Sequence, residues 1–176
     1  MHEEVLDFLG RVKKAMPEHF KRRRVLEIGS YIINGSPRAF FEGCEYVGCD
    51  WRPGPGVDVV GFAHELNFAD SSFDVVVSTE CLEHDVHWSL TLDTMYRVLK
   101  PGGLLMLTTA AFDRKPHELD CAVDSYYRNL QPDELLPRLT GVALYEENRL
   151  FQGIHVACVK PAARGFSAML GRIGKR

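Results

Sequence analysis

The segment from Glu80 to His84 holds the densest group of side chains that could do chemistry. Its sequence, Glu-Cys-Leu-Glu-His, places Glu80, Glu83 and His84 at positions i, i+3 and i+4. If the segment is helical, two carboxylates and an imidazole share one face. One interpretation is an oxygen-rich magnesium site, which would lower the pKa of a bound hydroxyl. We favour a metal-free site with His84, supported by Glu83, as general base or positioning group; a histidine bonded only to backbone is the alternative.

A second group of candidate residues surrounds a glycine turn. The short apolar run 25–28 ends at Gly29, as expected for a strand buried on both faces of a parallel sheet. Asn34-Gly35 permits a turn, Ser36 can cap a helix and Pro37 suits the first helical position. The pattern therefore predicts a strand, a loop and a helix.

Asp50 follows the next apolar run, 45–49, about 20 residues after the glycine turn. Two adjacent ribose hydroxyls can donate to one carboxylate, so a nucleotide-like ligand is expected between Gly29 and Asp50. Trp51 comes next and could stack on a purine or pack over its own loop. Glu27 lies inside an apolar run, and a buried carboxylate needs a partner.

Composition indicates one soluble globular domain. The chain has 176 residues, of which 45% are hydrophobic and 26% charged, with a net charge of -3. No global attraction to nucleic acid is expected, and the basic run 21–24 fits a solvated connector better. No apolar run is long enough to span a bilayer and no signal peptide is recognisable, so we expect a cytoplasmic protein. The five scattered cysteines suggest buried thiols rather than disulfides or zinc ligands.

Apolar periodicity predicts an alternation of strands and helices, which is typical of an α/β fold. We expect helices at 3–16, 87–99 and 132–139, and strands at 25–28, 45–49, 57–60, 73–78, 104–109, 142–146 and 154–159. Residues 110–130 have no clear period and are a candidate active-site loop. The domain is expected to cover residues 1–161, followed by a basic tail at 162–176.

Four motifs in this order resemble the class I S-adenosylmethionine-dependent methyltransferases, in the branch of small stand-alone domains. They are Val25-Leu26-Glu27-Ile28-Gly29, Tyr46-Val47-Gly48-Cys49-Asp50, Phe73-Asp74-Val75-Val76 leading to Leu82-Glu83-His84, and Arg97-Val98-Leu99-Lys100-Pro101-Gly102-Gly103. The resemblance implies a Rossmann-like, mostly parallel seven-stranded sheet with an antiparallel last strand and helices on both faces. It implies S-adenosylmethionine as cofactor, held by residues among Glu27, Gly29, Ser30, Asp50, Trp51, Ala63, His64 and Ser78.

The sequence departs from that family at two places. Only the first glycine of the usual Gly-x-Gly-x-Gly remains, as Gly29, and Gly35 is displaced along the chain. Phe62 occupies the position where the family often has an acid for the adenine amino group. The amide of Ala63, or the side chains of His64 and Glu65, are the expected substitutes. Glu80, Glu83 and His84 also resemble the magnesium-binding element of certain O-methyltransferases.

The implied reaction is in-line transfer of a methyl group from a sulfonium, in which the protein mainly positions the reactants. We expect a small-molecule, sugar or lipid-linked acceptor rather than a folded protein, because without an inserted cap domain only the N-terminal helix and residues 110–130 can shape its pocket. O-methylation is the expected reaction. The polar and aromatic cluster 124–129 could bind that acceptor, with Tyr126, Tyr127 and Arg128 as candidates. Tyrosines that close the core are the alternative.

Two other functions remain open. The first is a catalytically inactive cofactor-binding or regulatory domain of the same fold, given the altered loops. The second, less favoured, is an NAD-dependent oxidoreductase, because Glu27 precedes the glycine and the later turn glycines are missing. In the tail, Phe166, Met169, Leu170 and Ile173 fall at helical spacing among basic residues; membrane contact there is possible but not favoured.

Overall fold

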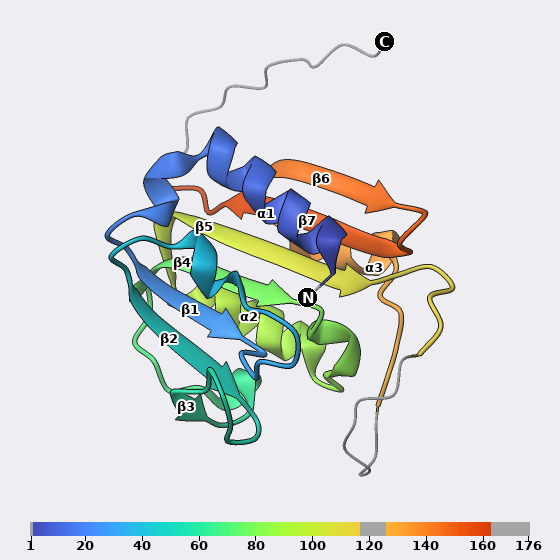
Figure 1. The fold of residues 1–176 in the computed structure, drawn as a ribbon, viewed down its shortest axis with the longest axis horizontal. Helices are drawn as coiled ribbons and strands as arrows, with labels where there is room; N and C mark the ends of the chain where they lie inside the picture. The colour runs from blue at the N-terminus through green and yellow to red at the C-terminus, as the bar shows by residue number, and fades with distance from the viewer. Residues whose placement is uncertain (1, 117–125, 163–176) are drawn as a thin grey trace.

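The computed structural model describes residues 2–116 and 126–162, and these form one α/β sandwich (Figure 1). Its strands are β1 (Arg24–Ile28), β2 (Glu45–Asp50), β3 (Val59–Val60), β4 (Phe73–Thr79), β5 (Leu99–Ala110), β6 (Val142–Asn148) and β7 (Gly153–Val159). Its α-helices are α1 (Glu3–Ala15), α2 (Trp88–Val98) and α3 (Pro132–Leu135). Short 3-10 turns occupy Pro17–Phe20, Pro37–Phe40, Ala63–Glu65, Leu82–His84 and Leu136–Arg138. The predicted tail, 162–176, lies outside the described residues apart from its first residue.

The seven strands form a single sheet in the order β3-β2-β1-β4-β5-β7-β6. The strands from β3 to β5 pair in parallel, and β7 lies antiparallel between β5 and β6. This arrangement confirms the predicted sheet with an inserted antiparallel last strand. The strand order reverses at β1, between β2 and β4, and ligands of such sheets bind at the carboxyl ends of the strands there.

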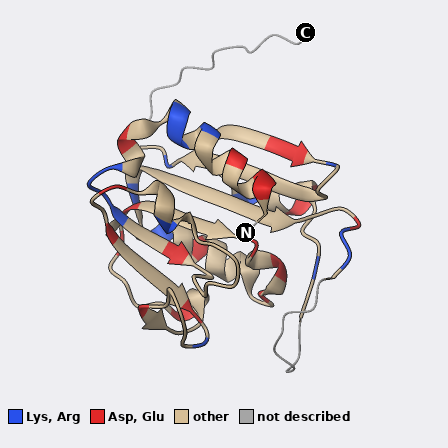
Figure 2. Ribbon diagram, viewed as in Figure 1, with Lys and Arg blue, Asp and Glu red and all other residues tan. Residues whose placement is uncertain are grey.

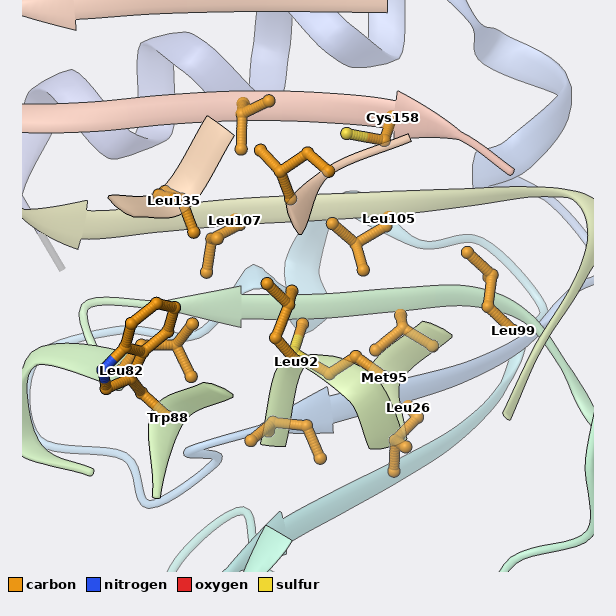
Figure 3. Close-up of a cluster of buried hydrophobic side chains, with 14 of the residues drawn as sticks. Leu26, Leu82, Trp88, Leu92, Met95, Leu99, Leu105, Leu107, Leu135 and Cys158 are labelled. Carbon is orange, nitrogen blue, oxygen red and sulfur yellow. The ribbon is translucent and has the colours of Figure 1, made fainter. Parts of the chain in front are cut away.

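Helices cover both faces of the sheet, as predicted (Figure 1). α1 buries Val5, Phe8, Leu9 and Val12 against one face, which includes Val25, Val75 and Leu104. α2 packs on the other face (Figure 3), where the cluster includes Leu26, Leu82, Trp88, Leu92, Met95, Leu105 and Leu107. Because successive strand residues point to opposite faces, β1 supplies Val25 to one cluster and Leu26 to the other. The sheet is therefore held rigidly from both sides.

Charged groups also join α1 to the antiparallel end of the sheet. The Arg11 guanidinium donates to both carboxylate oxygens of Glu146, at 2.8 and 2.7 Å, and Glu146 Oε1 lies 2.8 Å from Nδ1 of the buried His155. Figure 2 shows acidic residues on the first turns of α1 and at the end of β6. Arg11 also donates to Asp7 at 2.9 Å, so its guanidinium offsets the repulsion between two of these carboxylates and joins α1 to β6.

The predicted helix after the glycine turn is wrong in length. Ser36 does cap the segment, accepting from the Arg38 amide at 3.1 Å, and Pro37 does begin it. The segment is nevertheless a single 3-10 turn, because the loop from Gly29 extends to Ser36 and few residues remain before β2. α1 takes over the coverage of this face, and Phe40 packs beside it.

The predicted start of the fifth strand at Leu104 is also wrong, since β5 begins at Leu99. Its register against β4 shifts between the pairs Phe73 with Leu99 and Val75 with Leu104. Gly102, at φ +76°, lies in the irregular stretch between those pairs. A Pro-Gly-Gly segment therefore interrupts the ladder without ending the strand. Within residues 2–116 and 126–162, no helix has the length and apolarity needed to cross a membrane.

Candidate active site at the carboxyl edge of the sheet

Gly29 brings three segments into close contact at the end of β1. Its backbone has φ +78°, and the amides of Gly29 and Ser30 both donate to the Cys49 carbonyl, at 2.9 and 3.0 Å. A Cβ atom at this position would lie 2.5 Å from Sγ of Cys81, far inside van der Waals contact. Glycine is thus required both by the backbone conformation and by the turn after β4.

We expect Gly29→Ala to lower the free energy of unfolding by about 2 kcal/mol, because positive-φ strain adds to overpacking. Gly43→Ala is a matched control, since Gly43 has φ +62° but open space around its missing Cβ. The control substitution should lower the free energy of unfolding by only about 1 kcal/mol. Urea titration of both variants measures the difference. Equal losses would show that the contact with Cys81 has no energetic consequence.

The glycines missing from the first loop are compensated by glycines on a neighbouring segment. Cβ atoms at Gly48, Gly54 and Gly56 would lie within 2.1 Å of the Gly56 carbonyl oxygen, 2.1 Å of the Tyr31 ring and 2.6 Å of the Ser30 carbonyl oxygen, respectively. The bulkier first loop is therefore accommodated by close backbone approach from β2 and the loop after it. This packing could not be predicted from the residues around Gly54 and Gly56, because it depends on where the first loop lies in the folded protein.

Asp50 lies at the end of β2 with its carboxylate directed at the glycine loop. Oδ2 accepts from the Tyr31 amide at 3.2 Å, and Oδ1 accepts from the Arg52 amide at 3.3 Å. Each carboxylate oxygen has a further lone pair, so the group can still accept from a diol. Arg52 lies over the Tyr31 ring at 3.9 Å, whereas Trp51 is 59% exposed. The indole is thus on the surface beside Asp50 rather than packed into the core.

The segment expected to hold a purine forms the 3-10 turn Ala63–Glu65. Phe62 precedes it and is 55% exposed. The His64 ring lies between two others, with centroids 5.9 Å from Phe62 and 4.4 Å from His87. The sequence did not predict that His87, just before α2, lies beside His64, because only the packing of α2 on this turn brings the two rings together.

Glu27 is almost fully buried, and the structure supplies the partners that its position demands. Oε2 accepts from the Tyr46 hydroxyl at 2.9 Å and from the Ser36 hydroxyl at 3.4 Å. Burial raises the pKa of Glu27 to about 7, although these donors favour the ionised form. Ser30 is also buried, and its hydroxyl has no hydrogen-bond partner within the described residues. Ser78, fully buried on β4, pairs with Ile28 of β1.

The segment with Glu80, Glu83 and His84 does not form the predicted helical face. Only Leu82–His84 turns, as a 3-10 helix, and Glu80 lies before it at φ +52°. Glu83 is fully buried and accepts from the Thr109 hydroxyl at 3.0 Å. Within residues 2–116 and 126–162, no three His, Cys, Asp or Glu side chains are grouped so that they could hold a metal ion.

His84 is held by the last part of the predicted active-site loop, 110–130. Its Nδ1 lies 3.3 Å from the Tyr126 carbonyl oxygen, and its ring meets that of Tyr127 edge to face at 5.3 Å. The Arg128 amide donates to the Glu83 carbonyl at 2.8 Å. Tyr126 to Arg128 thus lie beside Glu83 and His84, although the Arg128 guanidinium pairs with Glu134. The rest of the predicted acceptor cluster, 124–125, lies outside the described residues.

Arg114 is the main site residue that sequence reasoning missed. It follows β5, forms an ion pair with Glu80, and lies 4.2 Å from the centroid of the Phe151 ring. Nε2 of His2 lies 3.2 Å from its guanidinium. Four segments therefore meet at this arginine: the start of α1, the end of β4, the chain after β5 and the turn before β7. In the sequence, only its place in the polar segment 110–130 indicated that Arg114 could belong to the site.

Comparison with known proteins gives a consistent result for most of the chain. The sequence profile of a family described as "Methyltransferase domain" matches residues 1–158. A demethylmenaquinone methyltransferase of Paenarthrobacter aurescens is 29% identical over 131 residues, which are 69% of this chain and 48% of that protein. A phthiotriol/phenolphthiotriol dimycocerosates methyltransferase of Mycobacterium ulcerans is 47% identical over 55 residues, 31% of this chain and 20% of that protein. The chain thus spans less than half of the length of either relative.

Solved structures show the same fold at low sequence identity. The 1,6-didemethyltoxoflavin N1-methyltransferase of Burkholderia thailandensis, solved with S-adenosylhomocysteine, has a TM-score of 0.65 and 16% identity. The match covers 88% of this chain and 77% of that one. A phosphoethanolamine N-methyltransferase of Haemonchus contortus, also solved with S-adenosylhomocysteine, has a TM-score of 0.64 and 19% identity, covering 89% of this chain and 52% of that one.

Proposed function

The chain belongs to the methyltransferase-domain family, and from that premise we propose that it uses S-adenosylmethionine to methylate an oxygen of a small-molecule, sugar or lipid-linked acceptor. One observation supports the proposed location of the cofactor. Gly29 and Asp50 lie side by side where the strand order reverses, and the Tyr31 amide of the glycine loop donates to the Asp50 carboxylate. A catalytically inactive domain that only binds the cofactor is the second candidate, supported by the altered glycine loop.

The residues at this edge fit the chemistry of the cofactor. Gly29 and Ser30 would hold its methionine end. Gly29 has no side chain to obstruct the ligand, and the buried Ser30 hydroxyl could bond to a polar group of the ligand. Asp50 would accept from the ribose diol, with Trp51 beside it. The remaining candidates, Ala63 and His64 for adenine and Ser78 beneath the cofactor, lie on neighbouring segments of the same edge.

Asp50→Ala is expected to weaken S-adenosylmethionine binding by about 1.5 to 3 kcal/mol, because charge-assisted hydrogen bonds to the ribose are lost. This corresponds to a roughly 10- to 100-fold larger Kd, measured by calorimetry. Asp70→Asn is the control: Asp70 is an exposed acid paired with Arg97 and should leave the Kd unchanged. Equal affinity of Asp50→Ala and the parent would remove the ribose role from Asp50.

The sulfonium supplies an activated methyl group, so the chain has to orient the acceptor and take up its proton. His84 is suited to this because Nδ1 faces the Tyr126 carbonyl oxygen, which cannot donate. Nδ1 therefore carries the proton in the neutral ring, and Nε2, which is closed off from solvent in this structure, has the lone pair of a base. Glu83 supports the turn that carries His84. The acceptor would approach past Tyr126 and Tyr127, whose rings can contact a flat or sugar-like group.

The relatives leave the acceptor atom open, since their names include N-methyltransferases and a ubiquinone/menaquinone C-methyltransferase. O-methylation is proposed because a base is needed mainly when the nucleophile is a hydroxyl. Incubation with methyl-labelled cofactor and panels of phenols, sugars, amines and quinones tests this. Label found only on nitrogen or carbon would overturn the choice of oxygen, and binding without transfer to any panel would favour the inactive domain.

A further inference from the structure

Two buried carboxylates at the end of β4 each have one oxygen whose partner is not evident. Arg114 occupies Oε2 of Glu80, and the Thr109 hydroxyl donates to Oε2 of Glu83. The side chain of Glu80 is only 12% exposed, and Glu83 is fully buried. Oε1 of each residue is inaccessible to solvent and has no hydrogen-bond partner within the described residues. A buried carboxylate oxygen without a hydrogen bond destabilises the folded state, so these two neighbouring oxygens need a common explanation.

The charges around the two carboxylates do not balance if both are ionised. Among residues 2–116 and 126–162, Arg114 supplies the fixed positive charge at this place, and it can neutralise one carboxylate. The other titratable groups that these residues bring around the pair are His2 at the start of α1, Cys81 and His84 from the turn after β4, and Tyr127 from the segment packed over that turn. Burial and the nearby carboxylates raise the pKa of the Cys81 thiol and of the Tyr127 phenol, so both groups are neutral at pH 7. A second ionised carboxylate would therefore stay uncompensated in a dry environment.

We propose that Glu80 and Glu83 share one proton at neutral pH, that Arg114 holds the negative charge on Glu80, and that loss of this proton strengthens His84 as a base. This inference rests on the proposed function only in its last part. A single hydrogen bond between the two Oε1 atoms would satisfy both of them, whereas two ionised carboxylates would repel each other. In accord with this, burial and the nearby charge of Glu80 raise the pKa of Glu83 to about 8.

The charge of the pair then depends on pH in a defined direction. Below pH 8, one carboxylate, one carboxylic acid and the Arg114 guanidinium sum to zero. Above pH 8, Glu83 loses its proton to solvent and one negative charge remains beside His84. A neighbouring negative charge stabilises the imidazolium and so makes the imidazole a stronger base. Arg114 acts on His84 only through Glu80, so it is a positioning residue.

Carboxyl-carbon NMR of glutamate-labelled protein, without ligand, tests the shared proton directly. We expect Glu83 to titrate with a midpoint near pH 8. Glu80→Gln removes the repulsion and should lower that midpoint by about one pH unit or more, whereas Arg114→Gln removes the compensating charge and should raise it. Arg149→Gln is the control, since Arg149 also lies over an aromatic ring at this end but pairs with Glu147; it should leave the midpoint unchanged.

A Glu83 midpoint near that of free glutamate, or one that neither Glu80→Gln nor Arg114→Gln displaces, would overturn the shared proton. The two variants alter opposite sides of the ion pair, so failure of one to fold leaves the other decisive. Imidazole NMR tests the link to His84: its titration should show a second inflection near pH 8 that Glu83→Gln removes. An unchanged His84 curve in that variant would overturn the link. These readouts need no turnover, so they stand even if methyl transfer is not found.

Discussion

Glu27→Gln is expected to be more stable than the parent protein by about 3 kcal/mol at pH 8, but by less than about 1 kcal/mol at pH 5. Burial raises the pKa of Glu27 from 4.5 to about 7, so the folded protein binds this proton more tightly than the unfolded chain. The resulting stabilisation is complete below about pH 4.5 and is lost as the pH rises through 7. At pH 8 the parent must keep an ionised carboxylate buried, whereas glutamine keeps an acceptor for the Tyr46 hydroxyl without the charge.

Urea unfolding of the ligand-free protein between pH 5 and pH 8 measures this difference. Glu42→Gln is the matched control, because Glu42 is exposed and its ion pairs with Lys21 and Lys13 lower its pKa. Removing that carboxylate should give no gain in stability at pH 8. A Glu27→Gln difference that does not vary with pH would show that this carboxylate is not held neutral by burial. Weaker cofactor binding by the same variant would indicate a role for Glu27 near the methionine end.

His84→Ala is expected to lower the rate of methyl transfer to a hydroxyl by about 100-fold or more, the usual contribution of a general base. The Kd for S-adenosylmethionine should change little, because His84 is assigned to the acceptor rather than to the cofactor. The rate under single-turnover conditions is the measurement. His19→Gln, a replacement at the opposite end of the sheet, should keep the parental rate.

The same assay separates the metal-free site from a magnesium site. Transfer that survives EDTA and is not raised by added magnesium agrees with His84 as base. Loss of transfer in EDTA and its recovery with magnesium would instead support ligation by Glu80, Glu83 and His84. That ligation would require Glu80 to leave Arg114, since the ion pair occupies one of its oxygens. Full activity of His84→Ala would contradict both forms of the site.

Local patterns in the sequence predicted the sheet and the position of its ligand edge. Buried strands such as 73–78 are apolar, β-branched and bounded by turn residues, so their own composition identifies them. The spacing of Gly29 and Asp50 located two consecutive strand ends, and parallel strands end at the same edge. α2 was predicted almost to the residue, because its apolar stripe and the Pro-Gly-Gly that follows it are both local signals.

The tertiary structure alone decided how the side chains at that edge are paired. Ser36 and Pro37 predicted a helix correctly at its start but not in its length, which depended on how far the loop extends before β2. Likewise, the spacing of Glu80, Glu83 and His84 suggested a shared helical face, but an ion pair with Arg114, 34 residues away, holds Glu80 elsewhere. Such pairs depend on which strands are neighbours in the sheet, and the order β1-β4-β5 is set by packing over the whole domain rather than by any local run of residues.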